Sequence, residues 1–459
     1  MRQRGRIRYG VVLLATALLY ATHPGLAAPD PVIEAEPAVT LPPEFDEFYR
    51  PAADVVAAAQ PGQVLRARSI TPAFLGFARL NIDAWQLLYR TTDSHGQAIS
   101  TVTTVLVPRG PAPANGRKLL SYQIAEDSAA QYCAPSYVLR SGAVPIEMVV
   151  AIESLIPIAA GIGQGWTVSL PDYEGPNSAI GASRISAQAT LDGIRATQSF
   201  HPAQLAGTAT PTALWGYSGG TVPTSFAAEI AQDYAPELDI VGVAAGGIAA
   251  ADFPAALRHN NNGAYTGLVG VAFAGLSNEY PEFRDVLRRE LDPLGQLFLG
   301  SKFIFCRAQG SALVPFYNFW GSYRGGDPLQ NPVIQRVIAD ISLGQRTPDM
   351  PLYIYHAQND EILPNAGTDR LVDQYCRDGA PSVAYVRELL AEHISGTISH
   401  LPGAFYWLRD RLDGVAAQPG CAITSPVTTV TDPLFTRAVV DLVPTALRAL
   451  IGEAIGAGG

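Results

Sequence analysis

Charged residues are scarce in this sequence: Asp, Glu, Lys and Arg make up 16% of its 459 residues, against about a quarter in an ordinary globular protein. Basic residues are the scarcer kind, with 31 Lys and Arg against 41 Asp and Glu. Four arginines lie within the first ten residues, and without residues 1–27 the balance is 27 basic against 41 acidic residues, a net charge of −14. Such an acidic chain is unsuited to nucleic acid or anionic membrane surfaces. We therefore expect neither as a partner.

Cysteines are few, and none is arranged for a metal. Neither a CxxC pair nor a cysteine at metal-ligand spacing from a histidine occurs, which argues against a zinc site. An even number of cysteines in an exported chain favours two disulfides, for which four residues allow three pairings. The residues are Cys133, Cys306, Cys376 and Cys421.

Long hydrophobic runs are also missing, apart from one close to the N-terminus. The arginine-rich start "MRQRGRIRYG" precedes the apolar run "VVLLATALLYA", and small residues follow in "HPGLAAP". This order is typical of a signal peptide, and the apolar run is too short to span a bilayer. We predict a signal peptide over residues 1–27, cleaved after Ala27, and a secreted protein with no integral membrane segment. An uncleaved anchor is the alternative.

The rest of the chain alternates between strand and helix patterns, which predicts an α/β fold with a mostly parallel sheet covered on both faces. No repeat of solenoid or propeller spacing interrupts it. Residues 28–75 form a proline-rich leader that we expect to be extended on the surface. The predicted core comprises residues 76–247 and 348–415, interrupted by a helical cap over 248–347. A C-terminal flap and tail follow over 416–459.

The stretch "LWGYSGGTVPTSFAAE" (residues 214–229) places Ser218 at a glycine-rich turn between a predicted strand and a predicted helix. A lone G-x-S-x-G is a weak signal, but this context is that of a nucleophile elbow. There the serine hydroxyl stands above the sheet edge, and the N–H of Gly219 points at a neighbouring oxyanion. The alternative is an ordinary strand-to-helix turn.

A nucleophilic serine needs a histidine base and a carboxylate that orients it, and on this kind of fold the acid precedes the histidine. The loop "NDEILP" after a predicted strand offers Asp360, with Glu361 as its rival. The segment "EHISGTISHLPGAF" offers His393 after the last predicted strand, and His400 at the next helix start. We predict Asp360 and His393. Of the other histidines outside the signal peptide, three fall in polar turns and one within a strand: His95, His201, His259 and His356.

Glu126 and Asp127 end another predicted strand in "YQIAEDSAAQYCAPSY". Taken alone, they are typical of an acidic helix N-terminus, where the helix dipole favours negative charge.

Several segments together resemble the secretory lipase family of the Candida lipase A type. They are "GYSGG", "YQIAEDSAAQYCAPSY", "GWTVSLPDYEG", "ATLDGIRA", "NDEILP" and "EHISG" with "LPGAFYWLRDRLDG", and the resemblance covers about residues 45–425. It implies an α/β-hydrolase fold with a helical cap and the hydrolysis of carboxylic esters, including triacylglycerols, without a metal or organic cofactor.

The resemblance also assigns individual residues. It implies Ser218 as nucleophile, Asp360 as acid and His393 as base, with Asp127 and the backbone of Gly219 as the oxyanion hole. The carboxyl group of Asp127 would have to be protonated to donate to an oxyanion; otherwise the backbone donates. The implied disulfides are Cys133–Cys306 and Cys376–Cys421. Residues 440–459 resemble an additional apolar helix without a counterpart in the family.

Two alternatives to an ester hydrolase stay open at this point. The same three residues serve acyltransferases and peptidases, and a hydrolase-like binding protein would need none of them. Within the cap, the apolar run "GLVGVAFAGL" is either a lid that meets a lipid or ester substrate or a buried helix.

Overall fold

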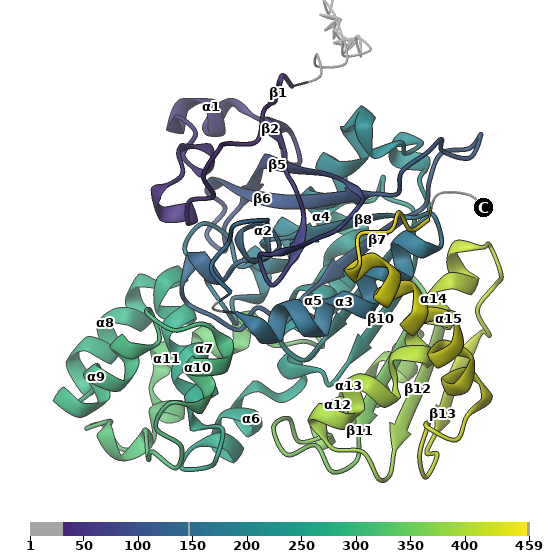
Figure 1. Ribbon diagram of the computed structural model, residues 1–459. Coiled ribbons are helices and arrows are strands. Elements are labelled where there is room, and N and C mark those ends of the chain that lie inside the picture. The colour runs from purple at the N-terminus through teal and green to yellow at the C-terminus, as the bar shows by residue number, and fades with distance from the viewer. Residues whose placement is uncertain (1–30, 146, 457–459) are drawn as a thin grey trace, which may run out of the picture. The chain divides into compact units, whose positions relative to one another are not determined.

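The computed structural model describes residues 31–145 and 147–456, so the predicted signal peptide lies outside the described residues. The centre is a sheet of eleven strands (Figure 1). Strands β8 to β13 run parallel to one another, whereas β2, β5, β6 and β8 pair in antiparallel fashion. The order is β1 (Ile33–Glu34), β2 (Val64–Ser69), β5 (Asp83–Thr92), β6 (Ala98–Val107), β8 (Thr167–Pro171), β7 (Leu119–Gln123), β9 (Thr212–Tyr217), β10 (Ile240–Gly246), β11 (Leu352–Ala357), β12 (Ser382–Glu388) and β13 (Gly420–Thr424).

Both faces of the central strands β7, β8 and β9 are buried, as their near-continuous apolar sequences require, whereas the edge strand β13 is exposed. Because neighbouring side chains in a strand point to opposite faces, Leu119 and Leu214 pack on one side while Leu120 and Trp215 pack on the other. Helices α4 (Ser183–Ser199), α5 (Thr221–Tyr234) and α12 (Ala366–Arg377) cover the first side. Helices α3 (Met148–Gly163), α14 (Leu401–Leu412) and α15 (Pro433–Leu450) cover the second. The predicted α/β class is confirmed.

Some elements were not anticipated from the sequence. Helix α3 was missed, although it is almost entirely apolar, because Pro157 and its glycines obscure a helical pattern. The leader, expected to be extended on the surface, also contributes β1 and β2 to the sheet and contains the short helix α1 (Ala53–Ala58). His393, expected in a loop, is the first residue of helix α13 (His393–Ser399).

Residues 248–347, which we call the cap, contain helices around a separate apolar core. The run "GLVGVAFAGL" forms most of α7 and is buried there, with Phe273 fully enclosed. Of its two interpretations, the buried helix is therefore the one seen. The cap helices are α6 (Phe253–Asn260), α7 (Thr266–Glu279), α8 (Pro281–Glu290), α9 (Pro293–Ser301), α10 (Arg307–Ala312) and α11 (Pro332–Ile341).

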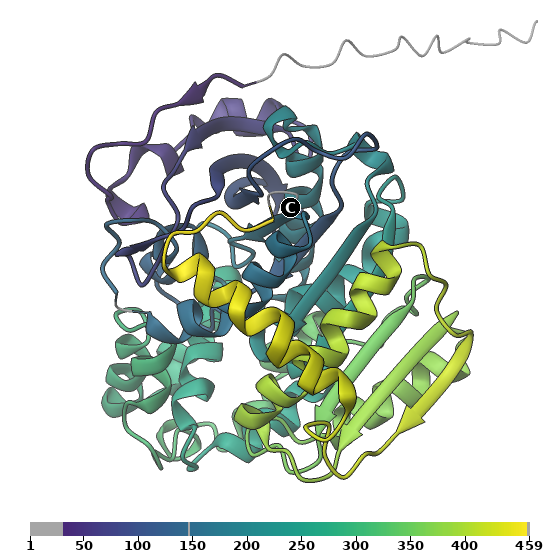
Figure 2. The ribbon, with the colours of Figure 1, turned by 45° about the vertical axis from the view of Figure 1, so that its right-hand side comes forward.

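Two disulfides connect distant parts of the chain, with the pairing that the resemblance implied. Cys133 binds Cys306 and so links the segment after β7 to the cap. Cys376 binds Cys421 and so links α12 to β13. The apolar helix expected over 440–459 starts earlier, at Pro433, and runs beside α14 (Figure 2). No helix within residues 31–145 and 147–456 is both long and apolar enough to cross a membrane.

Candidate active site

Ser218 stands at a tight turn between β9 and α5, the context that the sequence predicted. Its φ of +52° lies in the left-handed region, which non-glycine residues adopt at a cost and which is concentrated at functional sites. The turn is possible because two neighbours lack side chains. A Cβ atom at Gly216 would lie 2.3 Å from the Gly220 carbonyl oxygen, and one at Gly220 would lie 2.1 Å from that of Gln123 in β7.

Ser218, His393 and Asp360 form an unbroken line of hydrogen bonds. The Oγ atom of Ser218 is 2.8 Å from Nε2 of His393. Nδ1 of His393 is 2.7 Å from Oδ2 of Asp360. The residues follow β9, β12 and β11, and the carboxyl ends of parallel strands lie at the same edge of a sheet. With Nδ1–H donating to Asp360, Nε2 is free to accept the serine proton.

Asp360 is buried as an ionised acceptor. Its Oδ1 accepts the backbone N–H groups of Ile362 and Leu363, at 3.0 and 2.6 Å. Nε2 of His356 lies 3.2 Å from Oδ2. Burial alone would raise the pKa of Asp360, but the hydrogen bonds from His356 and His393 outweigh it and hold the pKa well below its usual range. Asp360 therefore stays charged and orients His393.

The rival acid and base occupy other positions. Oε2 of Glu361 accepts the backbone N–H of His393 at 2.7 Å, so this side chain contacts the histidine backbone and not its ring. His400 is buried, with Nδ1 3.0 Å from the Gly396 carbonyl and Nε2 3.4 Å from Glu388. Of the remaining histidines, His95 is exposed in a polar turn and His356 is buried within β11, as expected. His201 and His259 are exposed, but the polar turns expected for them are wrong. His201 begins the short helix His201–Ala203, and His259 lies in the last turn of α6.

Asp127 lies against the elbow and has a strained backbone of its own, with φ +44°. Its carboxyl group is next to the Cα atom of Gly219, and its Oδ2 is 3.4 Å from Nε of Arg307. Arg307 also donates to Glu153, at 2.6 Å, and to the Ala125 carbonyl, at 3.0 Å. Burial raises the pKa of Asp127, and the positive charge of Arg307 opposes that effect.

Arg307 and Glu153 were not anticipated from the sequence. Arg307 begins the cap helix α10, 180 positions along the chain from Asp127, and no local pattern connects the two. The available signal was its neighbour: Cys306 is tied to Cys133, six residues after Asp127. A residue next to a disulfide partner is held close to the segment that the disulfide reaches.

Further carboxyl groups are buried behind Asp127. Burial raises the pKa of Glu126 and of Glu174 well above their usual range, and that of Asp172 to about 7. In the described part of the chain, neither side-chain oxygen of Glu126 has a hydrogen-bond partner. The acidic helix N-terminus that Glu126 and Asp127 suggested when taken alone is wrong, because residues 124–128 are not helical and both side chains are buried. The group forms no metal site: no set of three or more His, Cys, Asp or Glu among the described residues is arranged to hold an ion.

A small apolar cavity of about 90 Å³ opens at Ser218 and extends into the cap. Asp127 and Gly219 line it beside the serine. Most of its other walls, Asn260 apart, are apolar, and cap helices α6 and α7 and the Asp360 loop contribute Phe253, Leu257, Val269, Ala272, Ile362 and Leu363. The serine hydroxyl therefore faces room for a short apolar group.

Known proteins are similar to this chain in sequence and fold over most of its length. Residues 143–420 match the family model described as "Secretory lipase". "Lipase A" of Arthroderma benhamiae is 34% identical over 91% of this chain and 89% of its own length. "Secreted triacylglycerol lipase LIP4" of Malassezia globosa is 34% identical over 86% and 87%. A Mycobacterium tuberculosis relative named a "probable inactive lipase" is 36% identical over 82% and 83%.

The solved structure of Candida antarctica lipase A in its closed state superposes with a TM-score of 0.81 at 29% identity, covering 91% of this chain and 99% of that one. The predicted α/β-hydrolase fold is thereby confirmed, together with the resemblance found in the sequence. The chain belongs to the secretory lipase family.

Proposed function

We propose that this protein is an extracellular lipase that hydrolyses carboxylic esters through Ser218, His393 and Asp360. The observation that carries the proposal is the continuous hydrogen-bond line from the serine hydroxyl to a buried carboxylate. One relative is named as inactive, so family membership alone does not establish activity. The geometry of these three side chains in this chain supports an active enzyme.

In the first half of the reaction, His393 Nε2 takes the hydroxyl proton while Oγ of Ser218 bonds to the ester carbonyl carbon. The carbonyl π electrons move onto oxygen and give a tetrahedral oxyanion. When the intermediate collapses, the alcohol leaves with the proton from His393, and the acyl group stays on Ser218. Water, activated by the same histidine, then releases the carboxylic acid.

The oxyanion would be stabilised by the backbone N–H groups of Gly219 and Asp127. Of the two possibilities for Asp127, we favour the backbone, because its φ of +44° lies in the left-handed region, and such strain is concentrated at functional sites.

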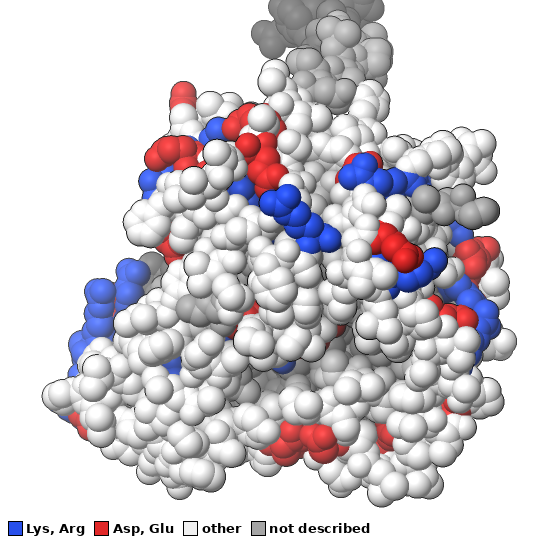
Figure 3. Space-filling view, in the orientation of Figure 1, with Lys and Arg blue, Asp and Glu red and all other residues white. Residues whose placement is uncertain are grey.

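Acylglycerols at a lipid surface are the substrates that we propose. Helices α3, α13 and α15 lie on the face shown in Figure 1, and charged side chains lie mainly toward the margins of that face (Figure 3). These helices expose large apolar residues: Met148, Ile152, Ile394, Ile398, Val439 and Leu447. α15 also exposes the ion pair of Arg437 and Asp441. A largely apolar surface of this kind beside an active site is suited to contact with neutral lipid.

We also propose where the protein acts and how its chain divides into domains. Membership of a secretory family supports an extracellular location. We propose cleavage of the signal peptide after Ala27, and a core of residues 76–247 and 348–415 with the cap over 248–347.

The test is hydrolysis of nitrophenyl esters from acetate to palmitate by the wild type and by Ser218→Ala. We expect the variant to lose about 10⁴-fold or more in kcat, because a triad without its nucleophile retains little rate acceleration. A fluorophosphonate should label the wild type and not the variant, since only an activated serine reacts. Activity in Ser218→Ala close to that of the wild type would refute the assignment.

A further inference from the structure

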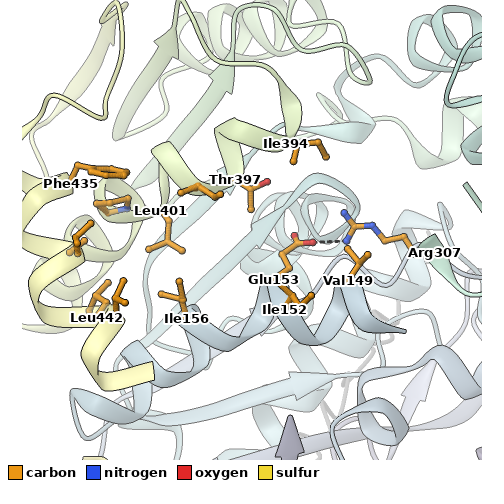
Figure 4. Close-up of a pocket in the computed structure, with 15 residues that line it drawn as sticks. Val149, Ile152, Glu153, Ile156, Arg307, Ile394, Thr397, Leu401, Phe435 and Leu442 are labelled. Carbon is orange, nitrogen blue, oxygen red and sulfur yellow. Dashed lines mark hydrogen bonds and ion pairs between the residues drawn. The ribbon is translucent and has the colours of Figure 1, made fainter. Parts of the chain in front are cut away.

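A second, largely apolar cavity is lined by α3, α13, the start of α14 and α15, and only Arg307 reaches it from the cap. It has a volume of about 360 Å³, within the range of small-molecule sites. Figure 4 shows α3 below it, α13 and the start of α14 above it, and α15 at one end. We call it the α15 groove. Its lining residues are Val149, Ile152, Glu153, Ile156, Arg307, Ile394, Thr397, Ile398, Leu401, Pro402, Phe435, Ala438, Val439, Leu442 and Val443.

Three helical faces form the walls. On each, the lining residues recur at intervals of three and four, so they share one side of a helix. They are 149, 152, 153 and 156 from α3; 394, 397, 398 and 401 from α13 and the start of α14; and 435, 438, 439, 442 and 443 from α15. These faces leave a gap between them, and Ile152, Ile398 and Val439 remain 56%, 65% and 49% exposed. The groove therefore offers apolar surface that a ligand would cover.

One end of the groove adjoins the catalytic groups. Arg307 and Glu153 form an ion pair there (Figure 4), and Arg307 also contacts Asp127. The upper wall comes from α13, the helix whose first residue is His393. The groove thus starts beside the base and the oxyanion side of the site, and it extends along α3 toward α15.

The direction of proton transfer indicates which part of an ester would lie there. His393 must hand its proton to the leaving oxygen, so the alcohol departs on the histidine side of Ser218. The cavity beside Ser218 is lined by Gly219 and by cap helices, and we assign the acyl group to it. The α15 groove, whose upper wall is the helix that begins with His393, is then assigned to the alcohol side.

We propose that the α15 groove binds the aliphatic chain of the leaving alcohol, such as a second chain of an acylglycerol or the alkyl chain of a fatty alcohol. This inference rests on the proposed function and specifies its substrate. Aliphatic side chains dominate the walls and Phe435 is the one aromatic among the lining residues, which suits a flexible alkyl chain better than a ring. The single ion pair, at the catalytic end, leaves no charged partner for a polar headgroup along the walls.

The experiment holds the acyl part constant and varies the alcohol. The full chain is given butanoate esters of ethanol through octanol below their solubility limits, and kcat/KM is measured by titration of released butanoic acid. We expect kcat/KM to rise by up to about fourfold per added methylene, the value for complete burial of a CH₂ group. In Val439→Asp the octyl-to-ethyl ratio should fall at least tenfold, because a carboxylate in an apolar groove opposes burial of the chain.

Val440→Asp is the matched control. Val440 is the next residue on α15 and is 65% exposed, but it does not line the groove. It should retain the wild-type ratio. A flat wild-type series, an unchanged ratio in Val439→Asp, or an equal loss in Val440→Asp would each overturn the proposal. So would a Val439→Asp variant that lost its dependence on acyl length in a series of ethyl esters, since the groove would then hold the acyl chain.

Binding of 1-octanol tests the groove independently of ester hydrolysis. Ser218→Ala should bind 1-octanol in a calorimetric titration, and adding Val439→Asp should weaken that binding at least tenfold whereas adding Val440→Asp should not. If no ester is hydrolysed at Ser218 but this pattern holds, the proposed function fails and the groove remains a chain-binding site. Equal binding by both double variants would refute the groove.

Discussion

Replacing Gly219 by alanine tests the fit between the elbow and Asp127. The backbone of Gly219 is outside the left-handed region, so an alanine would not strain it. The obstacle is space: a Cβ atom there would lie 1.8 Å from Oδ1 of Asp127 and 2.6 Å from its Cγ atom. To reach an ordinary separation of 3.4 Å, the carboxyl group must retreat by about 1.6 Å.

Asp127 is poorly placed to retreat. Arg307 contacts its carboxyl group and is itself held by Glu153 and by the disulfide at Cys306. Misplacement of a catalytic group by about 1 Å costs on the order of 10²-fold in rate, and losing an oxyanion donor costs about 10²–10³-fold. We therefore expect kcat of Gly219→Ala on nitrophenyl butanoate to fall about 10²–10³-fold, with a smaller change in KM.

The assay needs two controls. Gly300→Ala, in the cap helix α9 with no atom near the added Cβ, should retain wild-type kcat and thermal stability. The double variant Gly219→Ala/Asp127→Ala should be no slower than Asp127→Ala alone, because removing the carboxyl group removes the clash. A kcat of Gly219→Ala within threefold of the wild-type value would refute the predicted clash. So would a double variant whose fold-loss in kcat equals the product of the two single losses.

Two further predictions concern the acid and the buried carboxyl groups. Asp360→Asn should lower kcat by about 10⁴-fold, because Asp360 orients the ring of His393. Glu361→Gln should lower kcat by less than tenfold, because Glu361 contacts only the His393 backbone. Equal losses of kcat in the two variants, measured at the same pH, would contradict the assignment. Because the folded pKa of Glu126, Asp172 and Glu174 is raised, their contribution to stability is complete below about pH 4 and is lost as the pH rises through the folded values. For Asp172, with a pKa of about 7, the loss is at most about 4 kcal/mol. The denaturant concentration at the unfolding midpoint should therefore decrease as the pH is raised from 5 to 8. The decrease should be smaller in Glu126→Gln than in the exposed control Glu282→Gln. A midpoint that rises over this range would contradict the prediction.

The sequence by itself determined the features that are encoded within short segments. The strand, the glycines and the helix around Ser218 are contiguous, and the close approach of Gly216 to the Gly220 carbonyl acts within five residues. The G-x-S-x-G motif and the positions of Asp360 and His393 after predicted strands were enough to propose the three residues, and the family resemblance implied the same three. Even there, the choice of His393 over His400 rested on position after a strand, and both are buried in the structure.

Only the tertiary structure decided which distant groups meet. His393 and Ser218 are 175 positions apart, and Cys133 and Cys306 are 173 apart, so no local pattern records either contact. Arg307 reaches Asp127 because the disulfide beside it ties the cap to the loop after β7. The α15 groove exists because three helices from separate parts of the chain leave their apolar faces incompletely packed. Periodicity predicts that a helix has an apolar face, but what covers that face is set by the packing of the whole chain.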